Sequence, residues 1–526
     1  MASQLFRTKS ADQLIRESEE PDRQMKRTLS ALDLTALGIG AIIGAGIFSL
    51  VGTASAGETF SSRIKTPLMN FIIGWLSGAE VRLGRPGAGP ALVISLVVAA
   101  IACAFAALCY AELASMIPIS GSAYTYSYAT LGEIFAWIIG WDLILEYAVG
   151  NMAVAVSWSG YFVKLLYSLF GLKLPLWMVS DHATAVDMIN SNSDALQYYS
   201  STALPTIAGY QIALNLPALF IVLLLTVLLV YGIKESARAN TIAVIVKTAI
   251  LIFFIAFGAF YLNPTNWQPF NPNGFTGIMS GSAIIFFAFI GFDAVSTTAE
   301  ETRNPQRDLP IGMIASLVIC TIIYVLVAGV MTGLKKYTSF AGDAAPIATA
   351  IGVINKPWLQ ALISAGALAG STSVLLVFQL GQPRIFMAMA RDGLLPRYFS
   401  KIHPGFRTPH ITTIWTGVIV GAVAMVTDIG SLADLTNIGT LSAFILVCLG
   451  VIALRRTAPE RHRPFRVPLV PLLPILGSLF CLGLMLSLPI ETWYRFVIWL
   501  VIGLVIYFLY GARHSKLRDA AVEKVL

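Results

Sequence analysis

The stretch LGIGAIIGAGIFSLVG, residues 37–52, and the stretch SGSAIIFFAFIGFDAVSTTAEET, residues 280–302, decide the fold of this chain. Both are apolar enough to enter a membrane, yet clustered glycines interrupt the first, and Gly291 and Asp293 interrupt the second. Small residues spaced by four also let helices pack closely. Each stretch alone therefore allows either a packing interface or a broken helix.

Composition places the chain in a membrane. Of its 526 residues 56% are hydrophobic and only 12% are charged, and the mean hydropathy is +0.76. A soluble domain carries about 25% charged residues, so a soluble enzyme, a nucleic-acid binder and a disordered scaffold are excluded. The net charge of +7 is attributed to orientation in the lipid bilayer and not to a nucleic-acid partner. The five cysteines lie in apolar runs without metal-ligand spacing, and no metal or cofactor is expected.

The apolar runs predict an all-α polytopic membrane protein with twelve transmembrane helices. These spans are expected near residues 34–51, 90–113, 131–170, 212–233, 239–262, 275–298, 310–334, 358–388, 412–427, 435–454, 472–488 and 493–510. The expected division is an arm at 1–33, a first repeat of five spans at 34–262, a second repeat of five spans at 263–454, two further spans within 455–510 and a tail at 511–526.

Two insertions, residues 57–89 and 171–211, interrupt the first repeat. The apolar patch at 67–76 is too short to span, so it is either re-entrant or a surface cap. A plain loop is expected for 171–211. Most of the 35 Lys and Arg residues lie in the arm, the tail and the loops on their side of the membrane. The positive-inside rule therefore predicts cytosolic termini, in a multi-pass protein of the plasma (inner) membrane.

Spans one and six hold corresponding places in the two halves of the chain. Glycine-interrupted spans at such places are typical of inverted-repeat transporters with a binding site at the membrane midplane. A break in span one near Gly44 to Gly46 leaves free N–H groups on Ala45, Gly46 and Ile47 at the positive end of a helix dipole. We expect a substrate carboxylate to bind there.

The break in span six is expected between Phe289 and Phe292. The preceding half-helix then ends in free carbonyls around Phe287, Ala288 and Phe289, which can accept hydrogen bonds from an ammonium group. Together the two breaks match the carboxylate and the ammonium group of an α-amino acid.

Five separated motifs carry a resemblance to a known family. They are GIGAIIGAGIF at 38–48, YAELASMIPISGSAYTYSY at 110–128, GWDLILEY at 140–147, FIGFDAVSTTAEETRNPQRDLP at 289–310 and GQPRIFMAMARDGLLP at 381–396. The chain resembles the cationic amino acid transporter family of the amino acid, polyamine and organocation superfamily over nearly its whole length. The resemblance implies the LeuT-like fold of inverted five-helix repeats and amino acid transport, commonly coupled to protons.

Lys247 lies about eight residues into the fifth span. A cation there costs several kcal/mol unless it snorkels, loses its charge or finds partners. The resemblance implies that this lysine occupies the place of the sodium ion in sodium-coupled relatives. We expect it to contact carbonyls near Gly40 and Ile43 and a hydroxyl such as Ser373, and to couple transport by losing and regaining a proton.

Three carboxylates lie inside the expected spans. Asp142 and Glu146, four residues apart, share one face of span three, and intramembrane carboxylates usually face the bundle interior. Glu146 is expected to shape the site or carry a proton. Asp142 is expected to contact residues of the site without contacting the substrate. Asp293 is expected either to bond the unwound backbone of span six or to lie in the substrate pathway, and the first is favoured.

The substrate side chain is expected to face Ser371 and Thr372 of span eight, with Glu146 across the site. This arrangement favours arginine, lysine or ornithine, and leaves small neutral amino acids such as alanine as the alternative. A salt-bridge network at the cytosolic gate is expected to include Glu300, Arg303 and Arg384.

Amino acid substrates, protons and the bilayer are therefore the expected partners, and a small membrane accessory subunit is left open. Among other classes, an ion channel would need a repeated filter sequence, and a membrane enzyme would need a nucleophile or metal motif within an apolar region. The sequence carries neither. An amino acid sensor that does not transport would keep every binding feature, so it stays an alternative.

Overall fold

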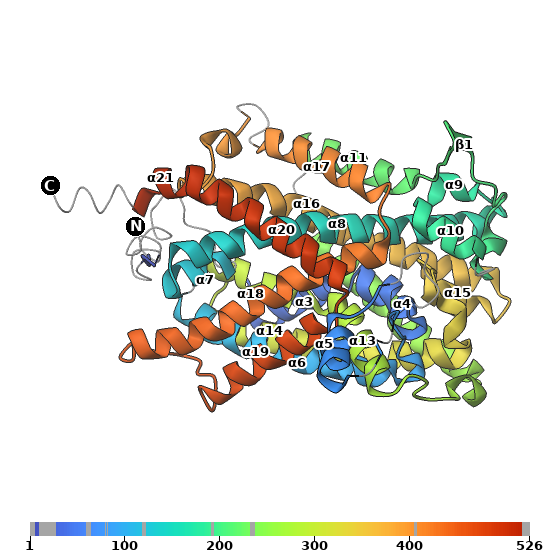
Figure 1. Cartoon of the computed structure of the whole chain (residues 1–526), viewed down its shortest axis with the longest axis horizontal. Helices are drawn as coiled ribbons and strands as arrows, with labels where there is room; N and C mark the ends of the chain where they lie inside the picture. The colour runs from blue at the N-terminus through green and yellow to red at the C-terminus, as the bar shows by residue number, and fades with distance from the viewer. Residues whose placement is uncertain are drawn as a thin grey trace.

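The computed structural model describes residues 6–9, 28–58, 65–78, 80–81, 83–117, 123–190, 194–231, 237–403 and 408–517. These residues form a bundle of long helices that run roughly along one axis (Figure 1). Lys9 and Lys516 both contact Asp392, so the first and last described segments meet at one end of the bundle, the terminal end. The opposite end is the distal end.

Most spans are single helices: α6 (Leu92–Met116), α8 (Glu133–Phe170), α11 (Leu216–Tyr231), α12 (Ala237–Gly258), α14 (Pro305–Leu334), α16 (Pro357–Arg391), α17 (His410–Ala424), α18 (Ile429–Thr457), α19 (Leu472–Leu486) and α20 (Ile490–Ile506). Two spans are broken. The first contains α3 (Ala31–Ile42), the π-helical turn η1 (Gly46–Leu50) and α4 (Val51–Ala56), and the second contains α13 (Gly274–Ile285), η6 (Phe286–Phe289) and η7 (Phe292–Glu301).

Among the described residues, eight helices are long and apolar enough to cross a bilayer, and the bent pair in span one makes a ninth. The other three expected spans are the shorter apolar helices α11, α17 and α19. They have 16, 15 and 15 residues, fewer than the roughly 20 that a perpendicular span needs. The expected all-α polytopic architecture is confirmed.

α8 is the longest helix and the centre of the packing. Its 38 residues extend about 57 Å, beyond the roughly 30 Å of a hydrocarbon core. It ends where Gly171 takes a left-handed conformation with φ of 64°. Its most extensive contacts are with α16 and α18, so it fixes the second repeat against the first.

The insertion at 171–211 is folded, and the expectation of a plain loop is wrong. It contains α9 (Leu176–Val179), α10 (His182–Asn190), η3 (Asp194–Tyr198) and a hairpin of β1 (Thr206–Ile207) and β2 (Tyr210–Gln211). Four of its residues form a small hydrophobic core with Ala213, which follows the insertion: Leu176, Ala185, Met188 and Ala195. These apolar residues are scattered along a polar stretch, so the sequence alone does not predict that they pack together. The insertion lies at the distal end near α15 (Pro346–Gly352) (Figure 1).

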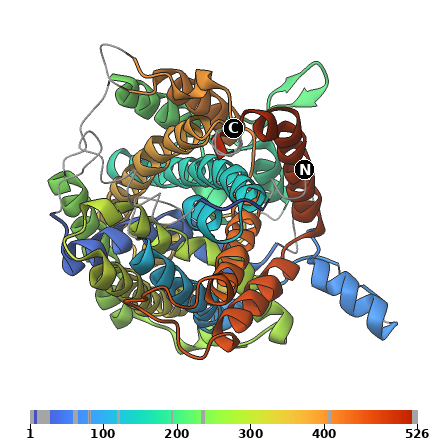
Figure 2. The same ribbon diagram turned by 90° about the vertical axis from the view of Figure 1, so that its left-hand side faces the viewer.

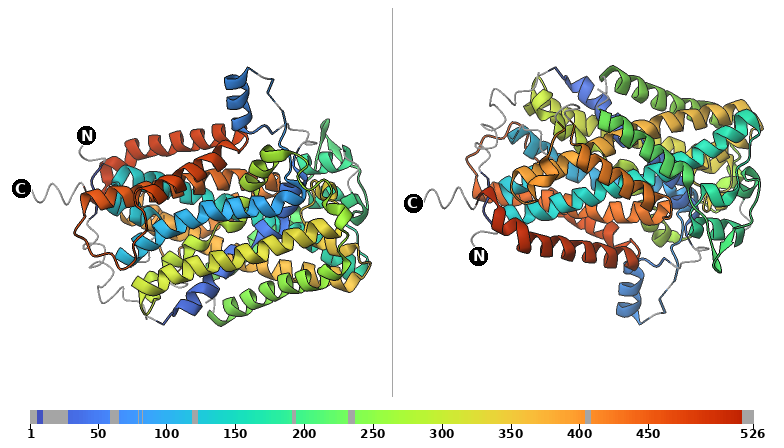
Figure 3. Two further views of the ribbon diagram at one scale, coloured as in Figure 1. Left: turned by 90° about the horizontal axis from the view of Figure 1, so that it is seen from below. Right: turned by 90° about the horizontal axis from the view of Figure 1, so that it is seen from above.

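The apolar patch of the other insertion forms α5 (Leu68–Ser77), which stands away from the bundle (Figures 2 and 3). It does not re-enter the bundle. The remaining described elements are short: η2 (Gly89–Ala91), α7 (Ala123–Thr130), η4 (Ala259–Tyr261), η5 (Pro264–Trp267), η8 (Tyr337–Phe340), η9 (Arg397–Ser400), η10 (Tyr507–Gly511) and α21 (Ala512–His514).

Candidate functional site

The break in the first span lies between Ile42, the last residue of α3, and Gly46, the first residue of η1. It overlaps the interval from Gly44 to Gly46 that the sequence predicts. The two half-helices are bent by 42°, and Ile43 is extended with φ of −72° and ψ of 100°. The first N–H groups of a helix have no partner inside it. Ala45, Gly46 and Ile47 are the first residues of the distal half-helix. Their N–H groups therefore lie at the positive end of its dipole.

The break in span six falls at Ile290 and Gly291, inside the expected interval. Ile290 is extended, and Gly291 has φ of 118°, a conformation that favours glycine. The carbonyl of Phe287 accepts a hydrogen bond from Ile290 N at 3.3 Å. The sequence analysis expected a free carbonyl at Phe287, but this carbonyl is engaged within η6, because the turn closes tightly beside the break in span one.

The two breaks pack directly against each other. A Cβ atom on Gly46 would lie 2.2 Å from Cα of Ala288, and one on Gly291 would lie 2.8 Å from the carbonyl oxygen of Ala41. Both glycines thus allow a close backbone approach. Gly44 has more room, since a Cβ atom there would meet a Val374 methyl group at 3.3 Å.

Tyr324 of α14 bridges the two breaks, and the sequence analysis missed it. Its buried hydroxyl lies 2.8 Å from the Ile42 carbonyl and 3.1 Å from the Ala288 carbonyl. A hydroxyl has one hydrogen, so the two carbonyls compete for one donor. A tyrosine in an apolar span gives no sequence signal that separates this bridge from ordinary core packing.

Lys247 of α12 lies at the end of α3 and is fully buried. Its Nζ donates to the carbonyl of Ile43 at 2.8 Å and to the carbonyl of Gly40. Gly370 of α16 packs against its aliphatic stem. The lysine therefore satisfies two carbonyls that the end of α3 leaves without helical partners.

A cavity of about 30 Å³ lies on the terminal side of the breaks. It is lined by Gly40, Ala41, Glu146, Tyr147, Ile290, Gly291, Asp293, Ala294, Val374, Val377 and Phe378. Such a volume holds one or two waters and is too small for an amino acid. Substrate entry therefore requires the surrounding helices to move. Glu146 of α8 is buried and lines this cavity together with Ile290 and Gly291 of the break. The carboxylate of Asp293 interacts with backbone N–H groups of Gly291 and Ala294.

The other expected site residues lie in different surroundings. Asp142 accepts a hydrogen bond from Ser442 of α18 at 2.9 Å, away from the cavity lining. Thr372 receives the indole N–H of Trp158 at 3.1 Å and donates to a carbonyl of its own helix, so its hydroxyl is engaged. Ser371 and Ser373 are buried on the same helix.

The expected salt bridges at the terminal end take another form. Arg303 donates to the carbonyl of Thr28, and the exposed Arg384 has no ion pair among the described residues; the side chain of Glu300 lies outside them. Instead Lys9 pairs with Asp392 at 2.7 Å, and the Tyr124 hydroxyl donates to the same carboxylate at 2.6 Å. Lys9 and Asp392 are separated by 383 residues, so their pairing has no local pattern.

A closed layer covers the breaks on the distal side. The Tyr161 hydroxyl donates to the Phe48 carbonyl, and the two rings pack edge to face. The Ser49 and Ser157 hydroxyls lie 2.5 Å apart, and the Ser49 hydroxyl also lies 2.5 Å from the carbonyl of Ala344. These contacts join the two halves of the chain on the distal side of the breaks.

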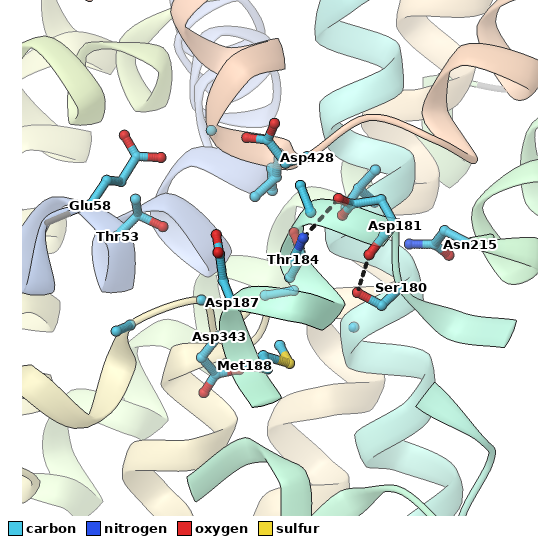
Figure 4. Close-up of a pocket in the computed structure, with 18 of the residues that line it drawn as sticks. Thr53, Glu58, Ser180, Asp181, Thr184, Asp187, Met188, Asn215, Asp343 and Asp428 are labelled. Atoms are coloured by element: carbon cyan, nitrogen blue, oxygen red, sulfur yellow. Dashed lines mark hydrogen bonds between the residues drawn. The ribbon is translucent and has the colours of Figure 1, made fainter. Parts of the chain in front are cut away.

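A pocket of about 110 Å³ lies beyond this layer at the distal end (Figure 4). Its walls carry the carboxyl groups of Glu58, Asp181, Asp187, Asp343 and Asp428. Asp181 accepts from Thr184 N at 3.0 Å, as the dashed line in Figure 4 indicates. Lys65 pairs with Glu58 and Asp428, and Lys164 pairs with Asp343, so three of these carboxyl groups are balanced by lysines. The pocket, called the vestibule below, lies on the side of the breaks opposite the small cavity.

Two broken helices that meet inside a polytopic bundle, with closed contacts on either side, define a membrane transport protein. The amino acid permease family profile matches residues 29–507. The chain is 46% identical to the branched-chain amino acid permease BcaP of Bacillus subtilis (strain 168) over 520 residues, which cover 99% of this chain and 100% of that protein.

Two further relatives are a methylthioribose transporter of the same organism and vacuolar cationic amino acid transporter 4 of Arabidopsis thaliana. The first is 42% identical over 98% of this chain and 99% of its own length, and the second is 37% identical over 87% and 68%. The chain belongs to the amino acid permease family, and with it to the superfamily of the LeuT-like fold. Its relatives are named transporters and permeases and not enzymes.

Proposed function

We propose that the protein is a secondary active, proton-coupled amino acid transporter that binds its substrate between the two helix breaks. The observation that carries this proposal is the contact between the breaks, where the start of η1 faces the end of η6. The substrate carboxylate binds the N–H groups of Ala45 to Ile47, and the ammonium group binds the carbonyls of Ala288 and Phe289. The substrate displaces part of the Tyr324 bridge as it enters.

Lys247 and Glu146 are the proposed proton-coupling groups. In its charged form Lys247 bonds the Gly40 and Ile43 carbonyls and holds the end of α3, and loss of its proton weakens these bonds. Glu146 lines the small cavity next to Gly40, so it provides a proton acceptor between the lysine region and the terminal end.

The substrate side chain is proposed to be aliphatic and neutral, as in branched-chain amino acids. The side chains of Ile47, Phe287 and Phe289 at the breaks are apolar and buried, and Val374 borders Gly44. The most similar of the relatives described above is named for branched-chain amino acids. The cationic preference expected from sequence is the second candidate, because the Glu146 carboxylate lies in the cavity beside the breaks.

Alternating access is proposed to open the two closed regions in turn. On the distal side the Phe48 and Tyr161 layer separates the breaks from the vestibule. On the terminal side Lys9, Asp392 and Tyr124 join the N-terminal arm to α16 and α7. We propose that the terminal end faces the cytosol and that the protein resides in the plasma (inner) membrane. The division into repeats at 34–262 and 263–454 is part of this proposal.

Uptake into liposomes by the purified protein tests this proposal. Labelled leucine, arginine and alanine are supplied separately, with and without an inward proton gradient, and empty liposomes are the control. We expect leucine uptake that rises with the gradient and is competed by isoleucine and valine. Arginine uptake without leucine uptake would replace the aliphatic assignment with the cationic one. Saturable binding with no uptake of any amino acid would identify a sensor.

A further inference from the structure

Helix α5 exposes a large apolar surface beside the start of α20. It projects sideways from the bundle, almost at right angles to the spans (Figures 2 and 3). Trp75 is 83% exposed, Leu76 70% and Ile73 49%. The helix, Leu68–Ser77, carries no charged residue. Ten residues of this composition would not stay in water without a covering partner.

The base of α5 is fixed at the distal end of a membrane span. Leu68 N donates to the Leu488 carbonyl at 3.0 Å, and Ile490 N donates to the Thr66 carbonyl at 3.1 Å. These two bonds attach the start of α5 to the turn between α19 and α20. The span that begins at Ile490 continues to His514, a length of about 37 Å for 25 residues, so the turn lies near one face of the bilayer.

Ion pairs hold the chain on both sides of α5. Lys65 Nζ lies 2.8 Å from Glu58 and 3.0 Å from Asp428. Arg85 lies 2.7 Å from Asp434 and 3.2 Å from Glu58. Asp428 and Asp434 belong to the start of α18, and Glu58 follows α4. The helix is therefore held at a defined depth and is not a loose loop.

We propose that α5 lies in the boundary between headgroups and acyl chains of the distal leaflet and anchors this end of the protein to the lipid. Its apolar surface continues the outward face of α20, where Tyr494, Val497, Ile498 and Val501 are exposed. Tryptophan prefers this depth because its ring is apolar and its N–H remains polar. Interfacial helices with a charged face keep that face toward water. The uncharged α5 has no such face, so it lies on the acyl-chain side of this boundary.

A lipid surface explains the pattern of exposure better than a protein partner does. Ile73, Trp75 and Leu76 are separated by 200° and 100° around a helix that turns about 100° per residue. A second copy of the chain would cover one stripe and leave the others in water. Lipid contacts all of these directions at once.

Spin labelling at single cysteines tests the depth of α5. The five native cysteines are buried, so a cysteine in a Trp75→Cys variant is the accessible labelling site. Tyr210→Cys on the β1–β2 hairpin, 78% exposed, is the control for water, and Val501→Cys on α20, 52% exposed, is the control for lipid. Collision rates with oxygen and with a water-soluble nickel complex are measured in liposomes.

We expect the label at position 75 to collide with nickel at least fivefold less than the label at position 210. Its collision rate with oxygen should lie between those of the labels at positions 210 and 501, because Val501 is about 17 Å deeper along α20. Nickel collisions equal to those at position 210 would place α5 in water and overturn the proposal. Spin–spin broadening that disappears on dilution with unlabelled protein would assign the surface to a second copy instead. If Trp75→Cys does not fold, Leu76→Cys replaces it with the same expectations.

Discussion

Replacing Lys247 with methionine removes the ammonium group and keeps an unbranched apolar side chain of similar length. The variant loses the bonds to the carbonyls of Gly40 and Ile43. A hydrogen bond from a charged donor contributes about 1.5–3 kcal/mol, so two bonds stabilise the end of α3 by about 3–6 kcal/mol. If about 1.5 kcal/mol, half of the lower estimate, is lost from the free energy of substrate binding, the affinity falls by about tenfold.

The assay is amino acid uptake into liposomes with and without an inward proton gradient. We expect the methionine variant to lose the acceleration that the gradient gives, because no proton remains to be exchanged at this position. Lys247→Arg is the matched control: arginine keeps the charge but does not release its proton, so it should retain substrate binding better than methionine while also losing the acceleration. Wild-type acceleration in the methionine variant would refute the coupling role of Lys247.

Three further predictions concern other contacts in the structure. Tyr324→Phe removes the donor shared by the two breaks. It should raise substrate affinity by about fivefold, about 1 kcal/mol, in equilibrium binding, because the substrate no longer displaces this hydrogen bond; an unchanged affinity would exclude the bridge from the site. Gly44→Ala should lower affinity several-fold, and Val374→Ala should restore it by making room for the new methyl group; failure of the rescue would show that the clash is not the cause. The ion pair with Lys65 lowers the pKa of Asp428 to about 2, so its stabilising effect is full above the ordinary pKa of 3.8 and is lost as pH falls from about 4 to 2; melting in detergent should show this loss in the wild type and not in Asp428→Asn.

The sequence predicted the helix breaks because they depend on local chemistry. Glycines inside apolar runs, at corresponding places in the two halves, are visible without a structure. The left-handed conformation of Gly291 and the close approach of Gly46 to Ala288 give these glycines a physical role. Because Gly46 lies so close to Ala288, a larger residue at position 46 would disturb the packing between the two breaks as well as the binding site.

Contacts between distant residues could not be predicted in this way. The Tyr324 bridge joins α14 to both breaks, and the Lys9 and Asp392 pair joins the N-terminal arm to the end of α16. Neither has a spacing or composition that distinguishes it. Charge counting suggested Arg303 and Arg384 for the terminal end, but it does not reveal which charges meet once the chain has folded.

The position of the substrate's two charged groups is the central claim, and binding of substrate analogues tests it most directly. Displacement of the labelled amino acid is measured for the parent, for its carboxamide, which lacks the carboxylate, and for its deaminated acid, which lacks the ammonium group. Each charged group is expected to make about two charge-assisted bonds of 1.5–3 kcal/mol, so each analogue should bind about 100-fold more weakly or worse. A carboxamide or deaminated acid that binds as tightly as the parent would contradict a site formed by the two helix breaks.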